Sequence, residues 1–230
     1  MPEPTWPKSE KPEEEPREKL SETLLGYDNP KMAEILAETE EVFSHNISAS
    51  NGMTHLYGDL AYPLMPPEFV RLLDTIKGEV QGGIFVDAGC GSSPDVRAAG
   101  RLGINRVVGI DLLSRPADSP DPKIQPYTED EFWQGKTILK IGDEITRGLA
   151  RMKSSMVNIV HMRALDIFSG DEELCLDEIH RVLKDGGYFI LDSSGNSIFR
   201  KFDLNKFEEV INYGDEMRIL KKKTMEDLVK

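Results

Sequence analysis

Hydrophobic residues from position 82 onwards occur as short continuous runs that alternate with segments of helical spacing. The runs that predict buried strands are Ile84–Val86, Val107–Ile110, Thr137–Ile141, Met156–Val160 and Tyr188–Leu191. Before the last run, apolar residues between 174 and 183 fall at helical spacing, and Gly186-Gly187 supplies the glycine that ends a helix. Such alternation is typical of parallel strands covered by helices. We therefore expect an α/β fold with a doubly wound, mostly parallel sheet.

Helical spacing also appears before the first strand, in one segment that opens at Asn29-Pro30 and another that begins near Pro67. These segments predict an N-terminal helical cap over residues 20–80, with a loop at 44–67. Residues 1–19 alternate Pro, Glu and Lys and are expected to form a disordered tail. The main domain would then occupy residues 81–230. Within it, the pattern predicts a capping box at 128–131, a helix over 204–211 and a last strand over 217–220.

Composition limits the class of protein. The chain has 230 residues, 39% of them hydrophobic, which is enough for one well-filled α/β domain. Its net charge of −13 argues against binding to nucleic acid, because such binding needs Lys and Arg to neutralise phosphates. Cys90 and Cys175 are far apart and show neither metal-ligand nor disulfide spacing, so no metal site is expected. No apolar run suggests a membrane span, and the acidic amino terminus is unlike a signal peptide, so we expect a cytoplasmic protein.

The chemistry concentrates around the first predicted strand. Gly89 and Gly91 follow that strand directly, and Ser93-Pro94 reads as the N-cap and first position of a helix. The next strand ends in Asp111, so the unit is βαβ, with glycines and a carboxylate at the carboxyl ends of neighbouring strands. This arrangement suits a ligand with an adenosine-like end. A dinucleotide is the rival ligand, but its fingerprint needs a third small residue near Pro94 and has no use for Asp87.

The segment Asp87-Ala88-Gly89-Cys90-Gly91 resembles the first motif of the class I S-adenosylmethionine-dependent methyltransferases. Asp111, Gly142-Asp143 and the run from Arg181 to Gly187 resemble later landmarks of the same family, in the same order. The resemblance covers about residues 84–191 and implies a Rossmann-like methyltransferase fold with S-adenosylmethionine as cofactor. Two departures from the family are the lack of a clean helix after Asp111 and a carboxyl end that is short for the family's closing antiparallel strand pair.

The resemblance also implies roles for individual residues. Asp87 would lie near the methionine amino group, directly or through water, and the loop Gly89, Cys90 and Gly91 would pass close to the carboxypropyl part. Asp111, followed by Leu112, would accept hydrogen bonds from the ribose hydroxyls, and Asp143 or the adjacent Glu144 would contact the adenine. Cys90 itself is expected to be a small buried filler rather than a nucleophile. His161 follows the fourth strand and is either a general base or a histidine that shapes the pocket.

The predicted activity is transfer of a methyl group to a small molecule or to a protein side chain. The acceptor would be bound by the variable segments at 44–67, 112–135 and after Asp192, in which Tyr57 and Tyr62 are candidates for a contact with the sulfonium. Two alternatives remain at this level. One is a binding or regulatory partner that keeps the methyltransferase fold without catalysis, and the other is a dinucleotide-dependent oxidoreductase.

Overall fold

The structure, a computed structural model, describes residues 18–26, 29–40, 67–91, 94–114, 127–163, 172–192, 204–212 and 217–224. The predicted tail up to residue 17 lies outside this range, as do Tyr57, Tyr62 and the rest of the loop at 44–66. The helices are α1 (Leu20–Leu24), α2 (Met32–Glu38), α4 (Pro67–Val80), α5 (Val96–Arg101), the 3-10 turn η1 (Leu112–Ser114), α6 (Ile145–Ala150) and α7 (Glu172–Val182). The strands are β1 (Ile84–Ala88), β2 (Arg106–Ile110), β3 (Tyr127–Trp133), β4 (Lys136–Gly142), β5 (Val157–Arg163), β6 (Leu183–Asp192), β7 (Phe207–Asn212) and β8 (Met217–Lys222).

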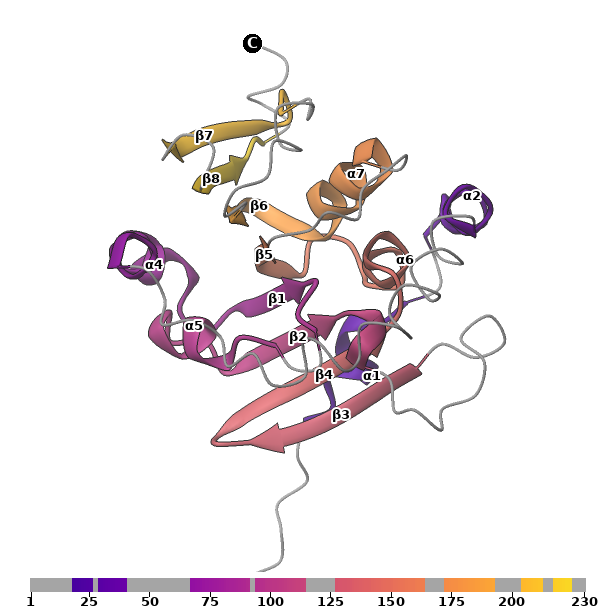
Figure 1. Ribbon diagram of the computed structural model, residues 1–230, viewed down its shortest axis with the longest axis horizontal. Helices are drawn as coiled ribbons and strands as arrows, with labels where there is room; N and C mark the ends of the chain where they lie inside the picture. Colours follow the sequence, from indigo (N-terminus) through magenta and orange to yellow (C-terminus); the bar gives the residue numbers. More distant parts are fainter. Residues whose placement is uncertain are drawn as a thin grey trace, which may run out of the picture.

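These strands form one sheet in the order β3-β4-β2-β1-β5-β6-β8-β7 (Figure 1). The five inner strands β4, β2, β1, β5 and β6 are parallel, and the antiparallel strand β3 and the pair β8–β7 extend the two edges. The chain starts at the central strand and winds outward in both directions. The predicted α/β fold with a doubly wound, mostly parallel sheet is therefore confirmed.

Two hydrophobic layers cover the sheet. Helices α1, α6 and α7 pack on one face, around Val86 and Val160, whereas α4 and α5 pack on the other, around Phe85 and Ile159. Strand β1 is buried at every position because both of its faces are covered. The helices of the predicted N-terminal cap are thus divided between the two faces, with α1 and α2 on one and α4 on the other.

The capping box predicted at Thr128–Glu131 is wrong. These residues lie inside β3, which pairs antiparallel with β4 along its whole length. Gln134 and Gly135 connect the two strands with φ values of 49° and 77°. Positive φ at both central residues is typical of a two-residue hairpin turn. Such a turn joins two paired antiparallel strands, here β3 and β4.

The helix predicted over residues 204–211 is also wrong. Phe207–Asn212 forms strand β7, which pairs with β8 and has a register shift between Glu209 and Ile211. Because β8 in turn pairs antiparallel with β6, the carboxyl edge of the sheet carries a complete antiparallel pair. The expectation that this edge is too short for such a pair is corrected accordingly.

Candidate functional site

The glycine loop, of which the structure describes residues 89–91, 94 and 95, leaves the carboxyl end of β1 at the centre of the sheet. Gly89 and Gly91 have φ values of 81° and 66°, in the left-handed region that favours glycine. The backbone N–H of Gly89 donates to the carbonyl of Ile110 at 2.8 Å, which holds the start of the loop against the end of β2. A Cβ built on Gly91 would meet no heavy atom of the described residues within 4 Å. The loop is therefore held on one side by β2, and no other described residue fills the space beside Gly91.

Asp111, the carboxylate predicted to bind ribose, is brought directly to this loop. Its Oδ2 accepts the backbone N–H of Gly91 at 2.9 Å. The residue is half-buried, and Leu112 next to it begins the turn η1. At the end of that turn the Ser114 hydroxyl donates to the carbonyl of Gly91 at 3.0 Å. The carboxylate and the glycines therefore form one unit at the carboxyl ends of two adjacent parallel strands, where ligands bind in open α/β sheets.

Cys90 points into the protein from the same loop. The side chain is buried, and its Sγ lies 3.7 Å from the Ser114 hydroxyl. Burial, with the nearby charges of Asp87 and Asp111, raises the pKa of the Cys90 thiol well above its usual range. A thiol that stays protonated is a poor nucleophile, so this environment fits a packing residue.

Two residues that shape the loop were not identified from the sequence. Gly109 lies inside β2, and a Cβ there would stand 2.9 Å from Cys90 Sγ and 3.1 Å from two ring carbons of Pro94. Asp95, not Ser93, is the N-cap of α5, since its carboxylate accepts the backbone N–H groups of Arg97 and Ala98, both at 3.0 Å. A glycine inside an otherwise β-branched strand was the signal for a close backbone approach at position 109.

Asp87 and His161 face each other across neighbouring strands. They are register partners on β1 and β5, and His161 Nδ1 lies 3.2 Å from Asp87 Oδ1. The other oxygen, Oδ2, accepts the backbone N–H of Asp95 at 2.7 Å. Both side chains are almost completely buried, with 2% of Asp87 and 1% of His161 exposed. The structure thus places His161 against Asp87, within β5 rather than after it; its role as a general base stays a prediction.

Asp143 lies at the carboxyl end of β4, two strands from β1, inside a buried ionic network. Its Oδ2 is 2.6 Å from Arg151 Nη2, and its Oδ1 is 3.2 Å from Arg147 Nε. Glu144 caps α6 by accepting the backbone N–H of Arg147 at 3.1 Å, and Arg147 Nη1 lies 3.6 Å from Glu40. Spacings of four and eight residues between Asp143 and the two arginines were a signal for this network. The adenine contact of Asp143 or Glu144 stays a prediction.

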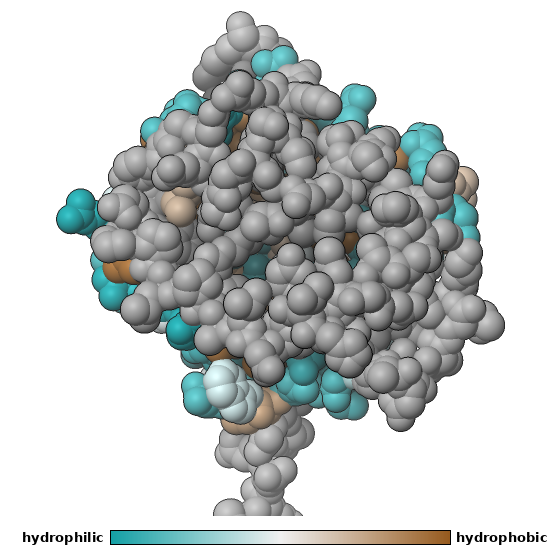
Figure 2. All heavy atoms as spheres, in the orientation of Figure 1, coloured by the Kyte–Doolittle hydropathy of each residue, from teal (hydrophilic) through white to brown (hydrophobic). Residues whose placement is uncertain are grey.

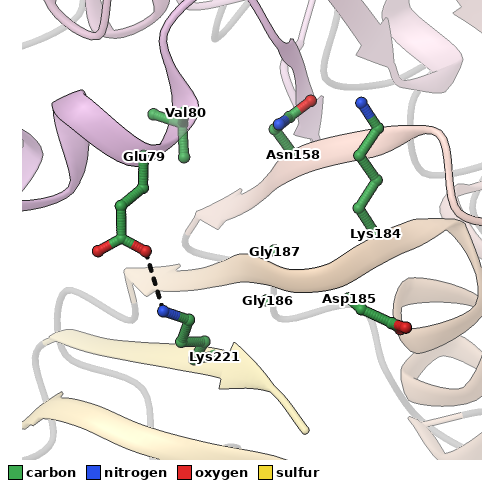
Figure 3. A pocket seen from close by; sticks show the side chains of 8 residues that line it. All are labelled: Glu79, Val80, Asn158, Lys184, Asp185, Gly186, Gly187 and Lys221. Carbon is green, nitrogen blue, oxygen red and sulfur yellow. Dashed lines mark hydrogen bonds and ion pairs between the residues drawn. The ribbon is translucent and has the colours of Figure 1, made fainter. Parts of the chain in front are cut away.

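A separate hollow lies at the opposite end of the sheet. Its volume is about 220 Å³, and it is lined by Glu79, Val80, Asn158, Lys184, Asp185, Gly186, Gly187 and Lys221 (Figure 3). It opens beside the amino ends of β5 and β6, where Glu79 Oε2 accepts from Lys221 Nζ at 2.9 Å. None of the predicted site residues lines it.

Most of the described residues visible at the margin of Figure 2 are hydrophilic, with a few hydrophobic ones between them. Among the described helices, none has both the length and the apolar character needed to cross a bilayer. Within the same part of the chain, no three His, Cys, Asp or Glu side chains gather as a metal site would require.

Comparison with known proteins finds a similarity over the central part of the chain. A family model described as a methyltransferase domain matches residues 86–191, from β1 to β6. No curated protein matches. Among solved structures, a candidate methyltransferase of Escherichia coli, yhhF, is 13% identical, with 72% of this chain and 92% of that chain covered and a TM-score of 0.48. A methyltransferase from Geobacter sulfurreducens is 15% identical, with 78% and 89% covered and a TM-score of 0.46.

Proposed function

We propose that this chain transfers the methyl group of S-adenosylmethionine to a small molecule or a protein side chain; the match of residues 86–191 to a methyltransferase domain model supports this. The observation that carries the proposal is the hydrogen bond between Gly91 N–H and Asp111 Oδ2. It joins the glycine loop and the carboxylate, the two features that the sequence predicted to bind the cofactor. Among the described residues, none occupies the space beside Gly91 where a ligand would approach the backbone.

The residues present fit this cofactor. Asp111 would hold the ribose, because a carboxylate accepts strong hydrogen bonds from hydroxyl groups. The loop from Gly89 to Gly91 would lie along the carboxypropyl part, and Asp87 would lie near the methionine amino group, directly or through water. The sulfonium supplies a methyl group that is already activated by positive charge. The protein's task is then to bring the acceptor in line with the S–CH₃ bond, which breaks as the bond from methyl to acceptor forms.

Calorimetric titration with S-adenosylhomocysteine tests this proposal. We expect the wild-type protein to bind and the Asp111→Ala variant to bind roughly ten- to hundredfold more weakly, since hydrogen bonds to a charged group are lost. Asp111→Asn should lose less, because its amide oxygen can still accept from Gly91. Asp74→Ala is the matched control: this carboxylate is exposed on α4 and pairs with Arg101, so its removal should leave the affinity unchanged.

Two results would favour the alternatives. Binding of a reduced nicotinamide cofactor in place of S-adenosylhomocysteine would indicate the oxidoreductase. Cofactor binding without methyl transfer to any acceptor in a broad panel, together with stable co-purification of another chain, would indicate the non-catalytic partner. An incomplete carboxyl edge of the sheet would have supported the non-catalytic partner. The structure has the closing strand pair β8–β7 at that edge, so this support is absent.

A further inference from the structure

His161 is held inside the sheet, in contact with the residue that precedes the glycine loop. Its strand continues to Arg163, so the ring lies two positions before the strand ends. The ring is 1% exposed and tilted against Phe85, with 5.9 Å between the ring centroids. Its Nδ1 is 3.2 Å from Asp87 Oδ1. At this distance Nδ1 and the carboxylate of Asp87 form a close polar contact inside the sheet.

Asp87 in turn connects the two ends of the glycine loop. It stands at the start of the loop, on β1, and its Oδ2 accepts the backbone N–H of Asp95 at the far end, at 2.7 Å. Asp95 then fixes α5 through its own carboxylate. One buried carboxylate therefore links β1 to the start of α5 through Oδ2 and contacts His161 through Oδ1.

We infer that His161 is a positioning residue for the glycine loop, acting through Asp87, rather than the general base. This inference rests on the proposed function, because the loop is the part of the protein that would receive the cofactor. A buried carboxylate needs polar partners on both oxygens to keep its geometry. Removal of His161 leaves Oδ1 without this partner, and the carboxylate can then turn away from Asp95.

The test compares His161→Leu with His161→Asn in the full-length protein. Asparagine places its amide nitrogen close to the position of Nδ1 and can donate to Asp87, whereas leucine fills the space without a polar group. We expect His161→Leu to weaken binding of S-adenosylhomocysteine about tenfold or more, and His161→Asn to stay within about threefold of the wild type. Ile159→Ala is the control for general destabilisation, since Ile159 is buried on the same face of β5 two residues earlier. It should lower the melting temperature and leave the affinity unchanged.

Hydrogen–deuterium exchange of the unliganded protein provides a readout that needs no ligand. His161→Leu should speed exchange of the amides of residues 89–91, 95 and 96 about tenfold, and neither His161→Asn nor Ile159→Ala should do so. Loop exchange and affinity equal to wild type in His161→Leu would overturn the inference, as would an Asn variant as impaired as the Leu variant. Failure of the wild type to bind S-adenosylhomocysteine would instead refute the proposed function, and the exchange experiment would still decide the role of His161.

Discussion

Replacing Gly109 by alanine tests whether the glycine loop packs on β2 as closely as the structure shows. The new Cβ would stand 2.9 Å from Cys90 Sγ and 3.1 Å from Cβ and Cδ of Pro94, whereas carbon atoms in contact prefer about 3.5–4.0 Å. A buried thiol and a rigid ring cannot swing aside as the end of a long side chain can. Overpacking of this kind costs about 1–3 kcal/mol. We therefore expect Gly109→Ala to lower the free energy of unfolding by that amount and to displace the loop.

Urea unfolding at neutral pH measures the change, and a second glycine provides the control. Gly78 lies in α4, and a Cβ there would meet nothing in the described residues within 4 Å. Gly78→Ala should stabilise the protein by up to about 1 kcal/mol, because glycine is a poor residue in a helix interior. Glycine to alanine is thus expected to lower the free energy of unfolding at position 109 and to raise it at position 78. A general effect of alanine cannot account for both results.

A double-mutant cycle identifies the atoms responsible. Cys90→Ala removes the sulfur at 2.9 Å, so Gly109→Ala should cost less in that background than in the wild type, by about 0.5 kcal/mol or more. Affinity for S-adenosylhomocysteine should fall in Gly109→Ala and recover in part in the double variant. A Gly109→Ala protein as stable as the wild type, or a cycle with no coupling, would refute the packing argument.

Two further predictions concern charges. Asp143→Asn should lower the free energy of unfolding by about 3 kcal/mol, because the buried side chains of Arg147 and Arg151 lose the carboxylate that they share. Urea unfolding measures this change, and a loss below about 1 kcal/mol would contradict the network. Although burial opposes the shift, hydrogen bonds from Lys206 and Lys31 hold the pKa of Asp177 below its ordinary value of 3.8. The ionised Asp177 carboxylate therefore stabilises the fold above about pH 3.8, and this stabilisation is lost as the pH falls through the lowered pKa. Wild type and Asp177→Asn should differ in free energy of unfolding at about pH 6 and converge in strong acid. A difference that stays constant with pH would argue against the ion pairs of Asp177 with Lys31 and Lys206.

Most of the parallel sheet was predictable because its strands are buried on both faces. Such strands appear in the sequence as continuous apolar runs, for example Val107–Ile110, with no need to know their neighbours. The glycine loop was equally readable, since Gly89 and Gly91 adopt backbone angles that other residues avoid. Asp111 followed from its place at a strand end. The candidate cofactor site was thus found largely from local signals.

The two incorrect elements lie at the edges of the sheet, where one face is exposed and the pattern is weak. In β7 the apolar residues Phe207, Val210 and Ile211 are three and four positions apart, as on one face of a helix, yet Phe207 packs in one layer and Ile211 in the other. The cause is a β-bulge. Glu209 pairs with Leu220 and Ile211 pairs with Ile219, which leaves Val210 as the extra residue. Only the pairing with β8 distinguishes this strand from a helix.

The sequence by itself determined the α/β fold, the position of the glycine loop and the carboxylate that closes it, because these depend on apolar runs, backbone angles and strand ends. The tertiary structure decided how the loop is held: that Asp87 faces His161, that Asp95 is tied to Asp87, and that Gly109 leaves room for Cys90. These contacts join segments far apart in the chain. Their geometry is set by the register between strands, and a one-residue change of register would turn each side chain to the opposite face of the sheet.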